Sequence, residues 1–175
     1  MEEIIESVLI SEDQIENACK DLGKRITKDY KDKDLVLVGL LKGCVPFISD
    51  LSKHINLPLE TQYMVVSSYR GTTTSHELQI KYDLETPVQG KDILLVEDIV
   101  DSGQTITTII EMFKRRKVNS IEVVSLLNKT ANNNLNPKYV GFEIPNKFVV
   151  GYGLDFNEKY RNIPYVGILK KEYYD

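Results

Sequence analysis

Four aliphatic residues at 93–96 run without a polar break, and two carboxylates, Glu97 and Asp98, follow them directly. A strand that is apolar in both side-chain directions is buried on both faces, which is typical of a parallel sheet. The two carboxylates come where such a strand should reach the surface. This segment therefore predicts an α/β protein with polar groups at the carboxyl end of a central strand, where sites of this fold class form.

The residues after the carboxylates predict a turn and a helix. Residues 101–105 are small, hydrogen-bonding and grouped around Gly103, and apolar residues then recur at helical spacing over 106–113. The first backbone N–H groups of a helix have no partner within it, so such a turn favours an anion, most usefully a phosphate. A plainer interpretation stays open on the turn alone: Asp101 or Ser102 caps the helix, and the carboxylates lie in a solvated loop.

Buried-strand runs and amphipathic helices alternate along the rest of the chain. Strands are predicted at 35–41, 59–66, 78–82, 93–96, 121–127, 140–144, 148–150 and 165–169, and helices at 11–30, 47–55 and 106–113. The alternation indicates an α/β fold with a mostly parallel, doubly wound sheet flanked by helices. The later short strands indicate a small antiparallel or irregular lobe beside it, which we call the hood.

Two shorter signals add detail to this pattern. Ser11 followed by Gln14 predicts a capping box at the start of the first helix. The stretch 68–76 has no hydrophobic period and is rich in small polar residues, which is typical of a mobile loop.

Length and composition fit one domain. The chain has 175 residues, of which 42% are hydrophobic, and this is enough for a sizeable core. We expect a single domain over 1–175 with a core at roughly 34–170. The helix at 11–30 and the C-terminal segment are expected to contribute to the hood.

Charge and targeting signals narrow the partners. A formal net charge of -4 and a pI near 5.3 disfavour a broad nucleic-acid-binding face. The acidic start has no long apolar run, and no uncharged run approaches the roughly 20 residues of a membrane span. Cys19 and Cys44 form neither a metal nor a disulfide pattern, so we expect reduced thiols, with Cys19 in the core. The sequence thus predicts a cytoplasmic protein with no nucleic-acid and no membrane partner.

The string at 93–105 closely resembles the phosphoribosyl-pyrophosphate-binding signature of type I phosphoribosyltransferases, in particular the purine-salvage branch. Further motifs occur in the order typical of hypoxanthine-guanine phosphoribosyltransferases, at 41–43, 68–69, 129, 141–145, 148–155 and 161. The resemblance implies the type I phosphoribosyltransferase fold. It also implies transfer of a 5-phosphoribosyl group from phosphoribosyl pyrophosphate to N9 of hypoxanthine or guanine, with Mg²⁺ as cofactor and release of pyrophosphate. A homodimer or homotetramer is the expected assembly.

The same resemblance implies roles for individual residues. Asp101 resembles the family's general acid/base, which faces N7 of the purine. Phosphoribosyl pyrophosphate is expected to bind at Lys42, Gly43, Glu97, Asp98, Asp101, Ser102, Gly103, Gln104, Thr105 and Arg161. Gln104 stands where many relatives carry lysine or arginine, but backbone N–H groups supply most of the phosphate donors.

The base, the metal and the lid complete the expected site. The purine is expected to contact Ile99, Lys129, Phe148, Val149 and Asp155, with Lys129 donating to O6 and Phe148 stacking on the ring. Mg²⁺ ligands are expected at Glu97, Asp98 and Asp155, and a lid at Ser68 and Tyr69.

The resemblance also bears on the loop around Lys42. In this family the peptide before that lysine is often cis. Cys44 departs from the commoner glycine or serine at its position, and we favour an inert thiol there over a reactive one.

Two other functions stay open at this stage. One is a regulatory RNA-binding protein on the same fold, which the acidic balance of the chain disfavours. The other is an enzyme for a different base, such as xanthine, adenine or a pyrimidine. Asp101 and Lys129 favour catalysis on a purine, whereas the preference among 6-oxopurines does not follow from the sequence.

Overall fold

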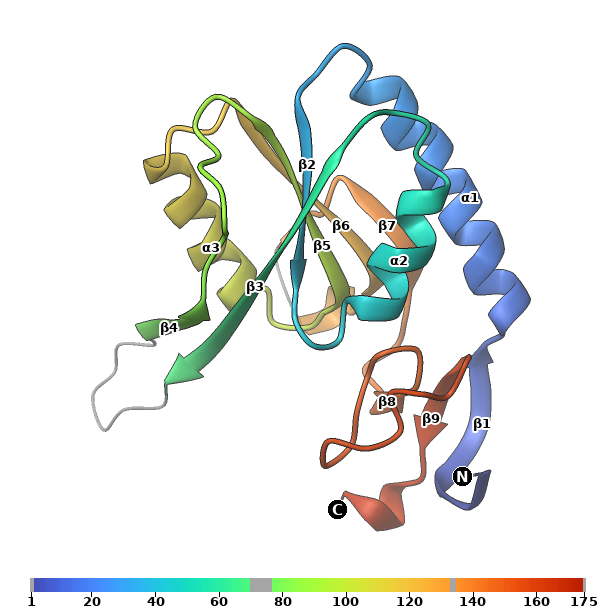
Figure 1. Cartoon of the computed structure of the whole chain (residues 1–175). Coiled ribbons are helices and arrows are strands. Elements are labelled where there is room, and N and C mark those ends of the chain that lie inside the picture. Colours follow the sequence, from blue (N-terminus) through green and yellow to red (C-terminus); the bar gives the residue numbers. More distant parts are fainter. Residues whose placement is uncertain (1, 70–76, 133–134, 175) are drawn as a thin grey trace.

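Six strands form the larger sheet, in the order β4-β3-β2-β5-β6-β7 (Figure 1). The computed structural model describes residues 2–69, 77–132 and 135–174. Neighbouring strands of this sheet are parallel except for β4, which is antiparallel to β3, so the predicted mostly parallel sheet is confirmed. The strands are β2 (Leu35–Leu40), β3 (Glu60–Tyr69), β4 (Glu77–Tyr82), β5 (Asp92–Val100), β6 (Ser120–Asn128) and β7 (Tyr139–Glu143).

Helices cover both faces of this sheet, as predicted for a doubly wound fold. The helices are α1 (Glu12–Asp29), α2 (Val45–Lys53) and α3 (Gln104–Arg115). Figure 1 shows α1 and α2 on one face and α3 on the other. Leu94 and Val96 of β5 pack in the apolar cluster under α1 and α2, whereas Ile93 and Leu95 pack in the cluster under α3. The absence of a polar break at 93–96 follows, because successive side chains enter opposite cores.

The first helix begins as its sequence predicts. The Ser11 hydroxyl accepts from the Gln14 backbone N–H at 3.3 Å, and the Gln14 side chain accepts from the Ser11 N–H at 2.8 Å. Cys19 is fully buried in this helix, as expected. The helix packs on α2 and β7, and its buried residues share one apolar cluster with hood residues such as Val149 and Val166, so a contribution of this helix to the hood stays a prediction.

The hood is a three-stranded antiparallel sheet with the order β1-β9-β8. Its strands are β1 (Ile5–Ile10), β8 (Val149–Val150) and β9 (Val166–Leu169), flanked by the short 3-10 helices η1 (Glu2–Ile4) and η3 (Lys171–Tyr173). β1 was not predicted, because two irregularities in its pairing with β9 break the alternation of buried and exposed residues. The hood lies beyond the carboxyl ends of β2 and β5 (Figure 1).

Three sequence predictions need correction. The strand predicted at 140–144 is β7, which pairs in parallel with β6 and so belongs to the main sheet instead of the hood. Ser68 and Tyr69, predicted in a mobile loop, are the last residues of β3 and pair with β4. Residues 70–76 of that stretch lie outside the described residues. β4 was expected to be exposed on one side, yet residues 79–82 of this edge strand are exposed on both faces.

Beyond β6 the chain forms a short 3-10 helix, η2 (Thr130–Asn132), near the predicted turn. In the part of the chain that the structure describes, no helix is both long and apolar enough to cross a membrane.

Truncating a side chain of the central strand should destabilise the protein strongly. Leu94 is completely buried between β5 and the first two helices, so Leu94→Ala should lower the free energy of unfolding by about 2–5 kcal/mol. Val8→Ala, at a side chain that is 54% exposed in the hood, should change it by less than about 0.5 kcal/mol. Urea unfolding of both variants makes the comparison. Equal losses would contradict the assignment of β5 to the core.

Candidate functional site

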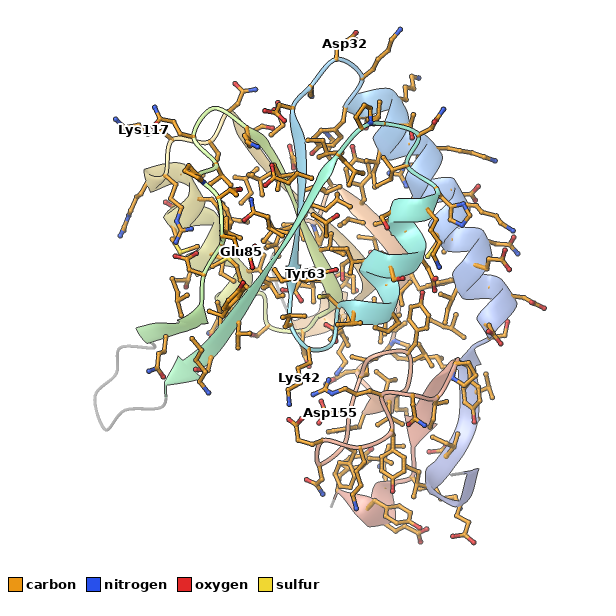
Figure 2. All side chains as sticks on the ribbon, viewed as in Figure 1. Asp32, Lys42, Tyr63, Glu85, Lys117 and Asp155 are labelled. Carbon is orange, nitrogen blue, oxygen red and sulfur yellow. The ribbon has the colours of Figure 1, made fainter. Side chains whose placement is uncertain are left out.

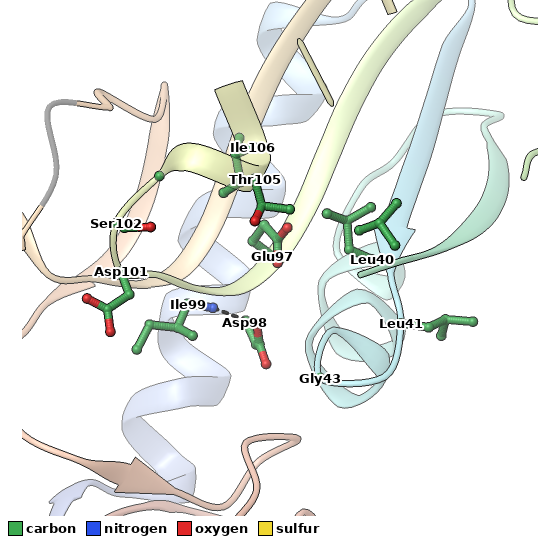
Figure 3. A pocket seen from close by; sticks show the side chains of 12 residues that line it. Leu40, Leu41, Gly43, Glu97, Asp98, Ile99, Asp101, Ser102, Thr105 and Ile106 are labelled. Carbon is green, nitrogen blue, oxygen red and sulfur yellow. Dashed lines mark hydrogen bonds between the residues drawn. The ribbon is translucent and has the colours of Figure 1, made fainter. Parts of the chain in front are cut away.

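A pocket of about 290 Å³ opens at the carboxyl end of β5, between the turn before α3 and the loop after β2 (Figure 3). Eight of the predicted site residues line it: Gly43, Glu97, Asp98, Ile99, Asp101, Ser102, Gly103 and Thr105. Leu40, Leu41, Val66 and Ile106 complete the lining. The structure thus brings together residues that sequence patterns could place only one element at a time.

The turn at 101–103 leads into α3 without a side-chain cap. The N-cap residue is Gly103, whose φ of 72° lies in the left-handed region that glycine adopts without steric cost. Neither Asp101 nor Ser102 is the N-cap residue, and the Ser102 hydroxyl accepts from the Gln104 N–H only at 3.5 Å, so the plainer interpretation of this turn was wrong. The first N–H groups of α3 have no partner within the helix and suit an anion in the pocket. Gln104 begins α3 but does not line the pocket.

The acidic pair belongs to β5, which runs on to Val100 instead of ending before the carboxylates. Glu97 is only 8% exposed, so it does not surface as expected. Burial, with the charge of Asp98 adding to it, raises the pKa of Glu97 well above its usual range. Burial also raises the pKa of Asp98 to about 6, although its carboxylate accepts from the Ile99 N–H at 2.8 Å (Figure 3). Both carboxylates therefore favour a ligand that donates hydrogen bonds or carries positive charge.

The loop after β2 packs closely between the end of β5 and the hood, and glycines allow this approach. A Cβ on Gly43 would lie 1.7 Å from the Asp98 Oδ2, and a Cβ on Gly153 would lie 2.0 Å from the Gly43 carbonyl oxygen. The loop after β2 therefore contacts the end of β5 on one side and the hood on the other. The Leu41–Lys42 peptide is cis, as the family resemblance implied.

The predicted catalytic residue and the predicted O6 donor lie side by side. Lys129 Nζ donates to Asp101 Oδ2 at 3.0 Å, from a side chain that is 10% exposed to one that is 52% exposed. The Lys129 backbone N–H donates to the Val100 carbonyl at 2.9 Å, which fixes the end of β6 next to the end of β5. An ammonium donor and a carboxylate thus stand next to each other at the edge of the pocket.

A second charged group lies beside the pocket, where Lys42 projects from the loop after β2 towards Asp155 in the hood (Figure 2). Arg161 donates from Nη1 to the Gly153 carbonyl at 2.7 Å and from Nη2 to Asp155 at 2.7 Å. Glu158 forms an ion pair with Lys42 at 2.7 Å. We did not predict Glu158, because it stands beyond the matched string 148–155. Its position three residues before Arg161 was the one sequence signal for an ion pair with that arginine.

Two predicted purine-binding residues lie in the hood, apart from the pocket lining. Phe148 is 37% exposed, stacks on Tyr174 with ring centroids 5.1 Å apart and meets Phe156 edge to face at 5.8 Å. Val149 is buried in β8. Their roles toward a base stay predictions, as do those of the lid residues Ser68 and Tyr69.

Cys44 is completely buried behind the loop after β2. Burial, reinforced by the charges of Glu97 and Asp98, raises the pKa of its thiol to about 12. A thiol with so high a pKa is neutral at physiological pH and therefore a poor nucleophile. The geometry supports the inert alternative.

Comparison with known proteins gives one consistent result. The phosphoribosyl transferase domain family matches residues 11–157. The chain is 48% identical over its whole length to the hypoxanthine-guanine phosphoribosyltransferase of Bacillus subtilis, of which it covers 99%, and 49% identical to that of Staphylococcus epidermidis over 99% of each chain. A crystal structure of a hypoxanthine phosphoribosyltransferase from Staphylococcus aureus superposes with a TM-score of 0.94, at 49% identity and over 98% of this chain and 95% of that one.

The raised pKa of Asp98 predicts a conflict between site chemistry and stability. Because the folded protein disfavours the ionised carboxylate, the contribution of Asp98 to stability is complete below its ordinary pKa of 3.8 and is lost as the pH rises through about 6. Asp98→Asn should therefore raise the free energy of unfolding at about pH 8, by at most about 3 kcal/mol, since water screens a partly buried group. Below about pH 4 the gain should vanish.

Urea unfolding at both pH values measures this effect, and Asp83→Asn is a control of opposite sign. A hydrogen bond from Arg116 lowers the pKa of Asp83, so removing that charge should cost stability at about pH 8. An Asp98→Asn protein that is less stable than the wild type at about pH 8 would contradict the assigned environment of the acidic pair.

Proposed function

The chain belongs to the phosphoribosyltransferase family, and on that premise we propose that it is a purine-salvage hypoxanthine-guanine phosphoribosyltransferase. It transfers the 5-phosphoribosyl group of phosphoribosyl pyrophosphate to N9 of hypoxanthine or guanine and releases pyrophosphate. The bond from C1′ of the ribose to the pyrophosphate oxygen breaks, and a bond from C1′ to N9 forms. The reaction needs positioning and charge stabilisation more than a protein nucleophile.

The Asp101–Lys129 pair is the observation that carries this proposal. The N7 and O6 atoms of a 6-oxopurine lie on one edge, close enough for a single bidentate partner to contact both. A carboxylate and an ammonium 3.0 Å apart offer that edge an acceptor for the N7 proton and a donor for O6. Asp101 accepts the N7 proton as N9 attacks C1′, and Lys129 holds O6. The 6-amino group of adenine is itself a donor and mismatches the ammonium.

The pocket supports the phosphoribosyl half of the reaction. Glu97 and Asp98 are acceptors when ionised, so they suit the two ribose hydroxyls. The turn at 101–105 presents the hydroxyls of Ser102 and Thr105 and the first N–H groups of α3 to the 5′-phosphate.

The charged group beside the pocket suits pyrophosphate, and the metal would bind between this group and the pocket. Lys42, Gly43 and Arg161 bind pyrophosphate, the arginine through its planar guanidinium. Within 2–69, 77–132 and 135–174, no three His, Cys, Asp or Glu side chains converge as a metal cage. This fits Mg²⁺, which binds through one or two carboxylates together with substrate phosphates. One or two of the predicted ligands Glu97, Asp98 and Asp155 would hold it together with substrate oxygens, and the ion would neutralise charge on the departing pyrophosphate.

The assembly and location follow the same family. We propose a homodimer or homotetramer in the cytoplasm, with the base and phosphoribosyl pyrophosphate as its small-molecule partners.

Replacing the proposed general base should separate chemistry from binding. Asp101→Asn keeps the size of the side chain but cannot accept the N7 proton as a carboxylate does. Turnover should fall by at least about 10²-fold, while the fold and the affinity for substrates stay near wild type. Steady-state ultraviolet assays of nucleotide formation measure the loss, and near-normal turnover would exclude this role for Asp101.

The order of rates across bases tests the substrate assignment. With phosphoribosyl pyrophosphate and Mg²⁺, hypoxanthine and guanine should react faster than adenine and uracil, because only a 6-oxopurine offers an acceptor to Lys129 beside a protonated N7. Xanthine shares that edge, so its rate completes the order among the three 6-oxopurines. If hypoxanthine and guanine are both inactive while another base reacts, the substrate assignment is wrong.

A further inference from the structure

Glu158 bridges the two cations that the proposed reaction assigns to pyrophosphate. Its Oε2 lies 2.7 Å from Lys42 Nζ, and its Oε1 lies 3.6 Å from Arg161 Nη2. Lys42 projects from the loop after β2 toward the hood, where Asp155 and the turn after it lie (Figure 2). One carboxylate, with one oxygen toward each cation, thus spans two elements that are far apart in the sequence.

The backbone holds Glu158 in this place. Phe156 and Lys159 exchange backbone hydrogen bonds at 3.1 Å, which closes a two-residue hairpin turn. The two turn residues, Asn157 and Glu158, have φ values of 52° and 61°, and the Glu158 N–H donates to Asp155 Oδ2 at 3.0 Å. The second position of such a turn favours glycine, because other residues adopt positive φ at a cost. A glutamate there indicates a use for its side chain.

The ion pair between Glu158 and Lys42 forms in the free protein, and a ligand of higher charge can displace it. A hydrogen bond from Lys42, with its charge, lowers the pKa of Glu158, so the side chain is ionised at neutral pH. The Lys42 and Glu158 side chains are each 67% exposed, and water screens a pair of this kind. A pyrophosphate group, with more negative charge and more acceptor oxygens, competes well for the same two cations.

We propose that Glu158 is a positioning residue of the pyrophosphate subsite. Its carboxylate is the counterion of Lys42 and Arg161 in the free protein, and pyrophosphate displaces it on binding. The inference rests on the proposed function. Substrate and product must displace Glu158, so it weakens their binding and favours pyrophosphate release. Asp155 stays on Arg161 at 2.7 Å, so the guanidinium keeps one carboxylate partner when Glu158 leaves.

Glu158→Gln tests this inference, because glutamine keeps the length of the side chain and removes its charge. The dissociation constant of inorganic pyrophosphate with Mg²⁺, measured by calorimetry, should fall about two- to fivefold, as expected for loss of a competing exposed ion pair. The KM for phosphoribosyl pyrophosphate with hypoxanthine should fall by a similar factor. In about 1 M salt, where screening acts over about 3 Å, both differences from the wild type should disappear.

Glu111→Gln is the matched control. Glu111 forms an exposed ion pair with Lys114 at 2.8 Å on α3, and its substitution changes the net charge by the same amount. The control should bind pyrophosphate like the wild type. Both variants should also unfold at the wild-type temperature, which excludes a general structural effect.

The possible outcomes separate the two claims. If the wild type converts hypoxanthine or guanine but Glu158→Gln binds pyrophosphate no more tightly than the wild type, the inference is wrong and the proposed function stands. An equal tightening by Glu111→Gln would also overturn the inference. If the wild type acts on neither base, the proposed function itself fails.

Discussion

The burial of two carboxylates at the end of β5 is the constraint on which the rest of the site depends. Glu97 and Asp98 directly follow the run 93–96, which is apolar on both faces of the strand, and burial raises the pKa of each. Holding charge there is unfavourable unless a ligand supplies hydrogen-bond donors or positive charge. The folded protein is therefore prepared for a ribose diol or a cation at this point, at the expense of its own stability. Asp92 at the other end of the strand accepts hydrogen bonds from Asn119 and Ser120, whereas the charge of Asp98 adds to the burial of Glu97.

The geometry around the acidic pair follows from close backbone packing. Gly43 lets the loop after β2 touch Asp98, and Gly153 lets the hood touch the carbonyl of Gly43. The pocket therefore adjoins the charged group beside it, and that group adjoins the hood. In the proposed reaction this order matches the substrates, with the 5′-phosphate at the turn before α3, the ribose on the acidic pair and pyrophosphate between Lys42 and Arg161.

Local signals predicted the parts of this structure that are local. The capping box at Ser11, the doubly apolar run at 93–96 and the helical period after Gly103 each specify one element, and all three are confirmed. The partner of a strand is a long-range property, so the pairing of β7 with the main sheet and of β1 with the hood could not be inferred from their own residues. Most pocket residues were predicted through the family resemblance. Glu158 was missed because its role depends on the fold bringing it to Lys42.

The central claim is that one pocket holds the nucleotide through the end of β5 and the turn before α3. A crystal structure of the protein with inosine monophosphate and Mg²⁺ tests it most directly. The account predicts ribose hydroxyls within about 3 Å of the Glu97 and Asp98 carboxylates, the 5′-phosphate on the N–H groups of 101–105, and the purine N7–O6 edge on Asp101 and Lys129. A nucleotide bound with its phosphate at Lys42 and Arg161, or outside the pocket, would contradict it.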